Sequence, residues 1–126
     1  SGSGALEYVY AADPVQTIEM SSENLSAVLA GMHDLATDGA VAPYFKDCIV
    51  DAAAKTGTIQ TGDTKNNNGA FVCFAPYDDP QIAVAIVIEK GGSGAALAST
   101  AVQVLNAYFS NASASSTVTG ENTLLG

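Results

Sequence analysis

Three extended segments joined by short turns constrain the fold of this chain more than any other feature. They run from Ile49 to Gln60, from Ala70 to Ala75 and from Gln81 to Glu89, and each is rich in apolar or β-branched residues. Asn68-Gly69, a common hairpin dipeptide, precedes the second segment, and Pro76 to Pro80 provides a turn before the third. Because connections this short join antiparallel neighbours, the sequence predicts an antiparallel meander.

Side-chain alternation predicts the faces of these strands. In the second strand, Phe71 and Cys73 fall on one face, and Val72 and Phe74 fall on the other. The third strand is apolar on both faces, as strands covered on both sides usually are. We therefore predict that the third strand lies buried in the centre of the sheet.

Two amphipathic segments flank the strands. The first is capped by Ser21 or Ser22 and should end near Thr37, before the turn signal Asp38-Gly39. Pro43 disfavours helix at Ala42 and predicts irregular backbone over the next few residues. The second runs from Ala95 to Phe109. Apolar residues recur at helical spacing in both, namely Leu25, Val28, Leu29, Met32 and Leu35 or Ala36 in the first, and Leu97, Ala101, Val104, Leu105 and Tyr108 in the second. We expect both stripes to belong to the core.

Together these patterns predict an α/β fold of the α+β type, an antiparallel sheet meander flanked by helices. Residues 1–4 (Ser-Gly-Ser-Gly) are typical of a linker or tag remnant, and Leu6 to Tyr10 predict a short strand. Residues 110–126 contain few large apolar side chains and predict a flexible tail. The folded part is thus expected over residues 5–109.

The charge of the chain excludes several classes of partner. Its 126 residues include four Lys, no Arg and thirteen acids, for a formal net charge of -9. Nucleic acids and anionic membrane surfaces need clustered basic residues, so neither is an expected partner. The sequence holds no apolar run of transmembrane length, and we expect no direct membrane contact from this segment.

The first strand carries an unusual lysine in Ala54-Lys55-Thr56-Gly57-Thr58. Lys-Thr-Gly is one of three short motifs of serine penicillin-recognising enzymes. Taken alone, it is also compatible with an exposed edge lysine beside two strand-forming threonines. Short motifs occur by chance, so the choice between an enzyme motif and an edge lysine depends on the surrounding sequence.

The surroundings resemble the C-terminal part of the transpeptidase domain of class B penicillin-binding proteins. The pieces follow the order of that family: a helix ending in Ala30-Gly31-Met32 and Asp38-Gly39, the Lys55 strand, the hairpin Phe71 to Tyr77, the strand Ile82 to Glu89, and a helix ending at Ala107-Tyr108-Phe109. The chain departs from the pattern at three positions: Ala54 and Cys73 stand where Gly is usual, and Ala70 stands where Trp is common. The Ala54 methyl group could narrow the cleft beside the lysine.

The resemblance implies a role for each residue of the motif. Lys55 would face the nucleophile, adding positive potential and a proton-relay contact. Thr56 and Thr58 would bind the carboxylate of the substrate or of a penicillin. The Thr58 backbone N–H would donate to the oxyanion, and its C=O would accept from the substrate amide. Gly57 would let the substrate lie close to the strand as an added strand.

The nucleophile motif of this family, Ser-x-x-Lys, is missing. The residues three positions before the four lysines are Pro43, Ala52, Gly62 and Val87. Ser22-Glu23-Asn24 fits the letters of the family's Ser-x-Asn motif, but helix capping explains it. The segment alone is therefore not expected to be active, and an N-terminal half carrying Ser-x-x-Lys is an expected partner.

The resemblance implies a peptidoglycan D,D-transpeptidase that takes stem peptides and β-lactams and needs no metal or other cofactor. It also implies a bacterial, extracytoplasmic envelope protein, membrane-anchored through sequence outside this chain. Two alternatives stay open. One is a non-catalytic module of the same fold that recognises peptide or β-lactam, and the other is an unrelated secreted α/β domain with a coincidental motif.

Other polar residues favour structural explanations. His33, the only histidine, is expected at the surface and predicts no metal site by itself. Cys48 and Cys73 are expected to be free buried thiols, with a disulfide as the alternative in an oxidising compartment. Asp78 and Asp79 are expected to be turn residues. The polar stretch that contains Asp63 is expected to be a solvated loop.

Overall fold

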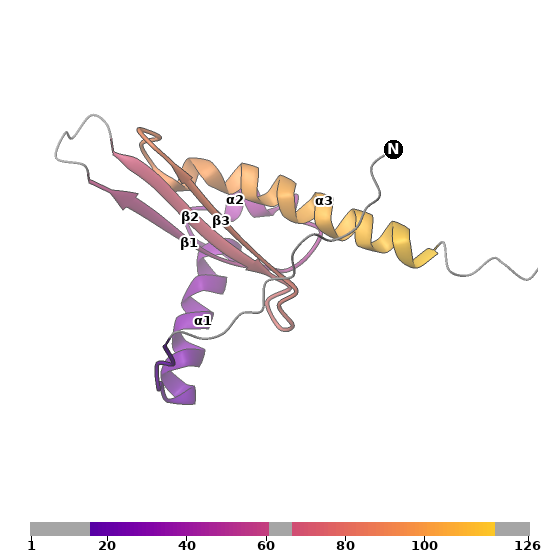
Figure 1. Cartoon of the computed structure of the whole chain (residues 1–126), viewed down its shortest axis with the longest axis horizontal. Helices are drawn as coiled ribbons and strands as arrows, with labels where there is room; N and C mark the ends of the chain where they lie inside the picture. The colour runs from indigo at the N-terminus through magenta and orange to yellow at the C-terminus, as the bar shows by residue number, and fades with distance from the viewer. Residues whose placement is uncertain (1–15, 61–66, 118–126) are drawn as a thin grey trace, which may run out of the picture.

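The structure is a computed structural model that describes residues 16–60 and 67–117. Its elements are α1 (Ser22–Thr37), α2 (Ala42–Phe45), β1 (Ala53–Ile59), β2 (Asn68–Ala75), β3 (Ile82–Ile88), the 3-10 helix η1 (Gly94–Leu97) and α3 (Ala98–Thr117). The strands form one antiparallel sheet in the order β1-β2-β3, with helices beside it (Figure 1). The predicted meander and the α+β class are confirmed. The expected linker, the short strand Leu6 to Tyr10 and Asp63 lie outside the described residues.

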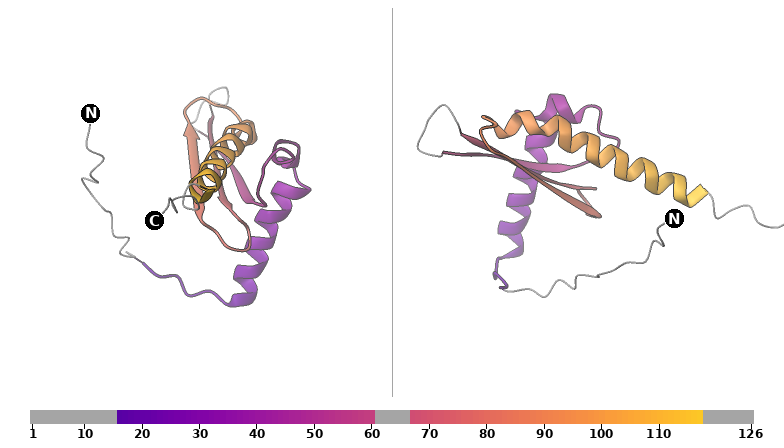
Figure 2. Two further views of the ribbon diagram at one scale, coloured as in Figure 1. Left: turned by 90° about the vertical axis from the view of Figure 1, so that its right-hand side faces the viewer. Right: turned by 45° about the horizontal axis from the view of Figure 1, so that its top comes forward.

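One face of the sheet carries the core. Phe71, Cys73 and Ala75 alternate along β2 and are buried, as the alternation predicted for the first two. Helix α3 lies along this face (Figure 2) and contributes Ala98, Ala101 and Leu105 to the same apolar cluster. Of the residues predicted to form the apolar stripe of the second helix, Leu97, Ala101 and Leu105 are buried as expected. Val104 and Tyr108 are exposed. Helix α3 also runs beyond the expected end at Phe109, to Thr117.

Both ends of helix α1 are determined by local sequence signals. The Ser21 hydroxyl accepts a hydrogen bond from the Asn24 backbone N–H at 3.2 Å, and the helix ends at Thr37 as expected. Its apolar stripe packs only near its C-terminal end, because the N-terminal turns extend away from the sheet (Figure 1). Leu25 and Val28 are 48% and 52% exposed, and Ala36 alone is fully buried. The expectation that the whole stripe is core is therefore wrong.

The segment after α1 is more regular than predicted. Helix α2 forms a single turn with Pro43 at its start. A proline is tolerated there because the first N–H groups of a helix have no intrahelical partner. The prediction of irregular backbone after Pro43 is therefore wrong.

Asn68 and Gly69 belong to β2 and not to a turn. Asn68 is paired with Ile59, and Gly69 is paired with Thr58. A Cβ atom on Gly69 would lie 3.4 Å from the Ser93 carbonyl carbon and oxygen, so the glycine serves the close approach of the segment before η1. The Asn68 side-chain oxygen accepts from the Lys90 backbone N–H at 2.9 Å. The prediction of a hairpin turn at this dipeptide is wrong, because a glycine in a strand can also serve close packing of the backbone.

Strand β3 lies at an edge, so the prediction of a central third strand is wrong. Strand β2 is central, and β3 alternates between half-buried and exposed positions. Ile82, Val84 and Ile86 pack against the core cluster. On the opposite face Val87 is 65% exposed. The apolar second face of β3 is therefore not covered by any part of the chain that the structure describes.

Strand β1 begins at Ala53 and not at Ile49, because a side chain of α3 engages the preceding backbone. The Asn106 amide donates through Nδ2 to the Asp47 carbonyl oxygen at 2.8 Å, and its Oδ1 accepts from the Ile49 N–H at 2.9 Å. One side chain thus holds this loop against α3.

We expect Asn106→Ala to destabilise the chain by about 1–3 kcal/mol, because it leaves two backbone groups of the loop without their partner. Urea unfolding followed by circular dichroism measures the change. Gln103→Ala, at an exposed position of the same helix, is the matched control and should change stability by less than about 0.5 kcal/mol. Equal stability of the two variants would contradict the anchoring role of Asn106.

Candidate functional site

The Lys55 segment forms an edge strand. Among the described residues, β1 pairs only with β2, so its other edge carries no strand. Lys55 is exposed, and its Nζ donates to the Thr56 carbonyl oxygen at 2.6 Å. An unpaired edge offers backbone N–H and C=O groups to an extended ligand. The structure therefore places the lysine on a strand whose outer edge is unpaired among the described residues.

The motif side chains point to different faces of β1. Lys55 and Gly57 are paired with Val72 and Ala70 on the face away from α3, and Thr56 is paired with the buried Phe71 on the core face. Thr58 lies two residues after Thr56, hence on the same face of β1, and is exposed. Lys55 therefore lies on the face opposite to the two threonine side chains, and the three residues share only the unpaired edge of β1. A ligand contacted by all of them has to lie along that edge.

Few atoms lie near Gly57 on the Lys55 face of β1. A Cβ atom placed there would meet only Ala70, with its Cβ at 3.4 Å and its carbonyl oxygen at 3.7 Å. The core face of the same residue is tightly covered, because a Cβ on Gly94 would come within 2.5 Å of the Gly57 oxygen and 2.9 Å of its nitrogen. The first residue of η1 thus supports the strand from behind. No pattern in the sequence predicts this support.

Ala54 does not narrow the space around Lys55. It is fully buried, pairs with Cys73 and belongs to the core cluster. Its methyl group lies on the face opposite to Lys55, because side chains alternate along a strand. The expectation that Ala54 narrows the cleft is therefore wrong.

The Lys55 face of the sheet is apolar around the lysine. A cavity of about 200 Å³ lies between α1 and this face. Its lining is Met32, Val72, Cys73, Phe74, Ala83, Val84 and Ala85. Lys55 thus presents a cation next to an apolar surface that no described segment fully covers.

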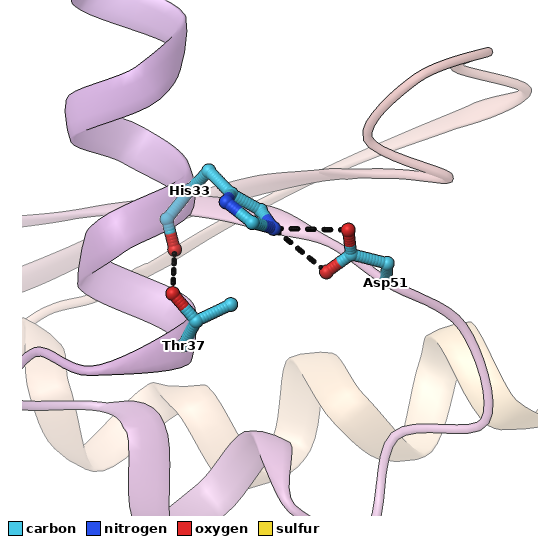
Figure 3. A network of polar contacts seen from close by, with 3 residues as sticks. All are labelled: His33, Thr37 and Asp51. Carbon is cyan, nitrogen blue, oxygen red and sulfur yellow. Dashed lines mark hydrogen bonds and ion pairs between the residues drawn. The ribbon is translucent and has the colours of Figure 1, made fainter.

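His33 is not a simple surface residue. Its Nε2 lies 2.9 Å from both carboxylate oxygens of Asp51 (Figure 3). Its ring stacks on Tyr77, with centroids 4.2 Å apart and an interplanar angle of 19°. Sequence reasoning missed this cluster because the three residues are far apart in the chain and form no spacing pattern.

The two cysteines are free thiols. Cys73 is buried in the core, and Cys48 is half-buried at its margin. Burial, with a smaller contribution from Cys48, raises the pKa of Cys73 from 9.0 to about 11. Burial is also the main cause that raises the pKa of Cys48. Both thiols are therefore protonated and weakly nucleophilic at neutral pH.

The raised pKa of Cys73 predicts a loss of stability in alkali. The folded state favours the neutral thiol, so its contribution is complete below about pH 9 and is lost as the pH rises toward about 11. Urea unfolding at pH 7, 9 and 10.5 should show a smaller loss for Cys73→Ala than for the unchanged chain. The comparison between the two proteins cancels the titration of lysines and tyrosines, and parallel pH profiles would contradict the prediction.

The comparisons with known proteins agree with this geometry. A family model described as the penicillin-binding protein transpeptidase domain matches residues 6–109. The chain belongs to that family. Peptidoglycan D,D-transpeptidase MrdA of Escherichia coli K12 is 33% identical over 92 residues, which cover 60% of this chain and 14% of the relative. Penicillin-binding protein 2A of Bacillus subtilis is 31% identical over 96 residues, which cover 69% of this chain and 13% of the relative.

Solved structures of penicillin-binding proteins share the fold. Pseudomonas aeruginosa PBP2, in complex with WCK 5153, matches with a TM-score of 0.64 and 30% identity over 78% of this chain and 23% of its own. Helicobacter pylori PBP2, in complex with MreC, matches with a TM-score of 0.65 and 25% identity over 72% of this chain and 18% of its own. The resemblance to the transpeptidase domain of class B penicillin-binding proteins is confirmed, and the chain spans less than a quarter of the length of these relatives.

No helix within residues 16–60 and 67–117 is long and apolar enough to cross a membrane. The roles expected for Lys55, Thr56, Gly57 and Thr58 are tested neither by the fold nor by the family match, and they stay predictions.

Proposed function

We propose that this chain forms one wall of the acyl-transfer site of a peptidoglycan D,D-transpeptidase. The observation that carries the proposal is the unpaired edge of β1, the strand that bears Lys55, Thr56 and Thr58, in a family whose curated relatives include D,D-transpeptidases. The other wall would come from an N-terminal half that carries Ser-x-x-Lys.

In the proposed reaction a stem peptide lies along β1 as an added strand. The serine oxygen of the other half bonds to a peptide carbonyl carbon, and an oxyanion forms. The Thr58 N–H stabilises this oxyanion as one of two donors. The C–N bond then breaks, the leaving amine takes a proton, and an acceptor amine later replaces the serine oxygen.

The residues around the motif would divide the work of binding. The Thr56 and Thr58 hydroxyls bind the terminal carboxylate, and the Thr58 carbonyl accepts from the substrate amide. Lys55 supplies positive potential in a chain whose net charge is -9, so it concentrates an anionic ligand at this edge. Its ammonium group also takes part in proton relay toward the serine. A β-lactam, which carries a carboxylate beside a reactive carbonyl, would occupy the same edge.

This function places the whole protein in the bacterial cell envelope, outside the cytoplasm, with its membrane anchor on sequence outside this chain. The chain alone lacks the nucleophile motif and is not active by itself.

A fluorescent penicillin tests the proposal. The isolated chain should form no covalent adduct, and labelling should appear when a companion chain bearing Ser-x-x-Lys is added. Denaturing gels measure the adduct. Labelling of the isolated chain, or no labelling of the assembled pair under conditions where both chains are folded, would refute the proposal.

The alternative is a recognition module of the same fold that binds peptide or β-lactam without turnover. Its supporting observation is the unpaired edge of β1 beside Lys55, which can bind an extended ligand without a nucleophile. Reversible penicillin binding by the assembled protein, without an adduct, would favour this module over the enzyme.

A further inference from the structure

The His33 cluster joins three segments that are distant in the sequence. His33 lies on α1, Asp51 lies two residues before β1, and Tyr77 lies in the turn between β2 and β3. The carboxylate only accepts hydrogen bonds when ionised, so Nε2 carries the proton and donates to both oxygens. The Tyr77 backbone N–H also donates to the Asp51 carbonyl oxygen at 3.0 Å. Asp51 is therefore held through both its side chain and its backbone.

The segment between Asp51 and Lys55 leaves little room for adjustment. Ala52, Ala53 and Ala54 are buried, the last two completely. Because protein interiors are close-packed, these three residues cannot shift without displacing their neighbours. A change in the position of Asp51 is therefore transmitted along the backbone to Lys55.

The cluster is also fixed on the helix side. The Thr37 hydroxyl donates to the His33 carbonyl oxygen at 3.0 Å, within the last turns of α1 (Figure 3). Tyr77 in turn stacks on Phe74 of β2, with ring centroids 6.4 Å apart. The imidazole thus has a fixed partner on either side, the Asp51 carboxylate at its edge and the Tyr77 ring on its face. Its side chain is only 27% exposed, although Asp51 is 57% exposed.

We propose that His33 is a positioning residue for the Lys55 strand. Held between Asp51 and Tyr77, its imidazole fixes the residues that lead into β1, after the loop that Asn106 holds, and thereby fixes Lys55 relative to α1. The inference about β1 stands on the geometry of the described residues, and only its consequence for acylation rests on the proposed function.

The test separates hydrogen bonding from ring packing. His33→Phe keeps an aromatic ring beside Tyr77 but removes the donor to Asp51, and His33→Gln keeps a donor but removes the stacked ring. Asp51→Asn weakens the acceptor while keeping its shape. Asp47→Asn, on the same loop, removes an exposed carboxylate and is the matched charge control.

Amide hydrogen exchange by NMR on the full chain gives the first readout. His33→Phe should speed exchange at the amides between Ala53 and Lys55 that pair with β2 by about tenfold, the equivalent of one lost charge-assisted hydrogen bond. Amides of α3 around Leu105 should be unchanged. His33→Gln should retain most of the protection, and Asp47→Asn should retain all of it. Uniform loss of protection across β1 and α3, or none at β1 in His33→Phe, would overturn the proposal.

Penicillin acylation of the pair assembled with a Ser-x-x-Lys companion gives the second readout. His33→Phe should lower the acylation rate constant by about tenfold, with a smaller change in the dissociation constant for the first, reversible step. His33→Gln should restore most of the rate. If the unchanged pair is not acylated, the proposed function fails, and the exchange data still decide whether His33 positions β1. An acylation rate in His33→Phe equal to that of the unchanged pair would overturn the positioning role in catalysis.

Discussion

Gly94→Ala is expected to destabilise the chain by about 3 kcal/mol or more, the range of severe overpacking. The new Cβ would clash with the Ala70 carbonyl oxygen and would lie 2.5 Å from the Gly57 oxygen and 2.9 Å from its nitrogen. All of these atoms are backbone, so no side chain can rotate away. Either η1 has to separate from the sheet, or β1 has to move at the residue next to Thr58.

Urea unfolding followed by circular dichroism measures this loss, and penicillin acylation of the assembled protein measures the displacement of β1. Gly31→Ala is the matched control, because a Cβ there meets nothing within 4 Å and the residue lies in the interior of α1. That change should stabilise the chain by about 0.5–1 kcal/mol, the usual gain from alanine over glycine in a helix. If Gly94→Ala were as stable as the unchanged chain, η1 would not press on β1 as described.

Lys55→Ala is expected to slow penicillin acylation of the assembled protein by about 10²- to 10⁴-fold, the range for loss of a proton-transfer or charge-stabilising group. Lys55 is exposed, and within the described part of the chain its Nζ donates to the neighbouring Thr56 carbonyl oxygen, so the change should cost little stability. The effect on rate should therefore be separable from unfolding.

Two further variants sharpen this prediction. Lys55→Arg keeps the charge but changes the geometry of the donors, so it should recover only part of the rate. Lys46→Ala removes an exposed lysine from the end of α2 and should leave the rate within about twofold, as expected for a distant surface charge. A rate for Lys55→Ala within the range of Lys46→Ala would show that the strand lysine has no part in the reaction.

Local patterns in the sequence were sufficient for α1, for the three strands, for most of α3 and for the order of these elements, but not for α2 or η1. The Ser21 cap, the end of α1 at Thr37 and the alternation along β2 each depend on residues within one or two turns or strands. These signals act through short-range geometry, which a sequence displays directly. The same was true of the strand that carries Lys55, apart from its first residues.

Long-range contacts account for what the sequence did not reveal. The start of β1 depends on Asn106 of α3, and the place of Gly69 in β2 goes with the approach of Ser93. The pairing of His33 with Asp51 joins residues 18 positions apart. No periodicity encodes such contacts, because they arise only once the elements have packed. The prediction of a central β3 failed for a related reason. An apolar second face indicates that something has to cover it, but it does not indicate which segment does so.

The position of β2 between its two neighbours has a consequence for how the protein could be handled experimentally. Within residues 16–60 and 67–117, β1 and β3 leave their outer edges unpaired on opposite sides of the sheet, separated by two inter-strand spacings, about 10 Å. Anything that lies along one edge is out of reach of the other. A peptide paired along the β3 edge should therefore not compete with a compound placed beside Lys55, and the two should bind independently.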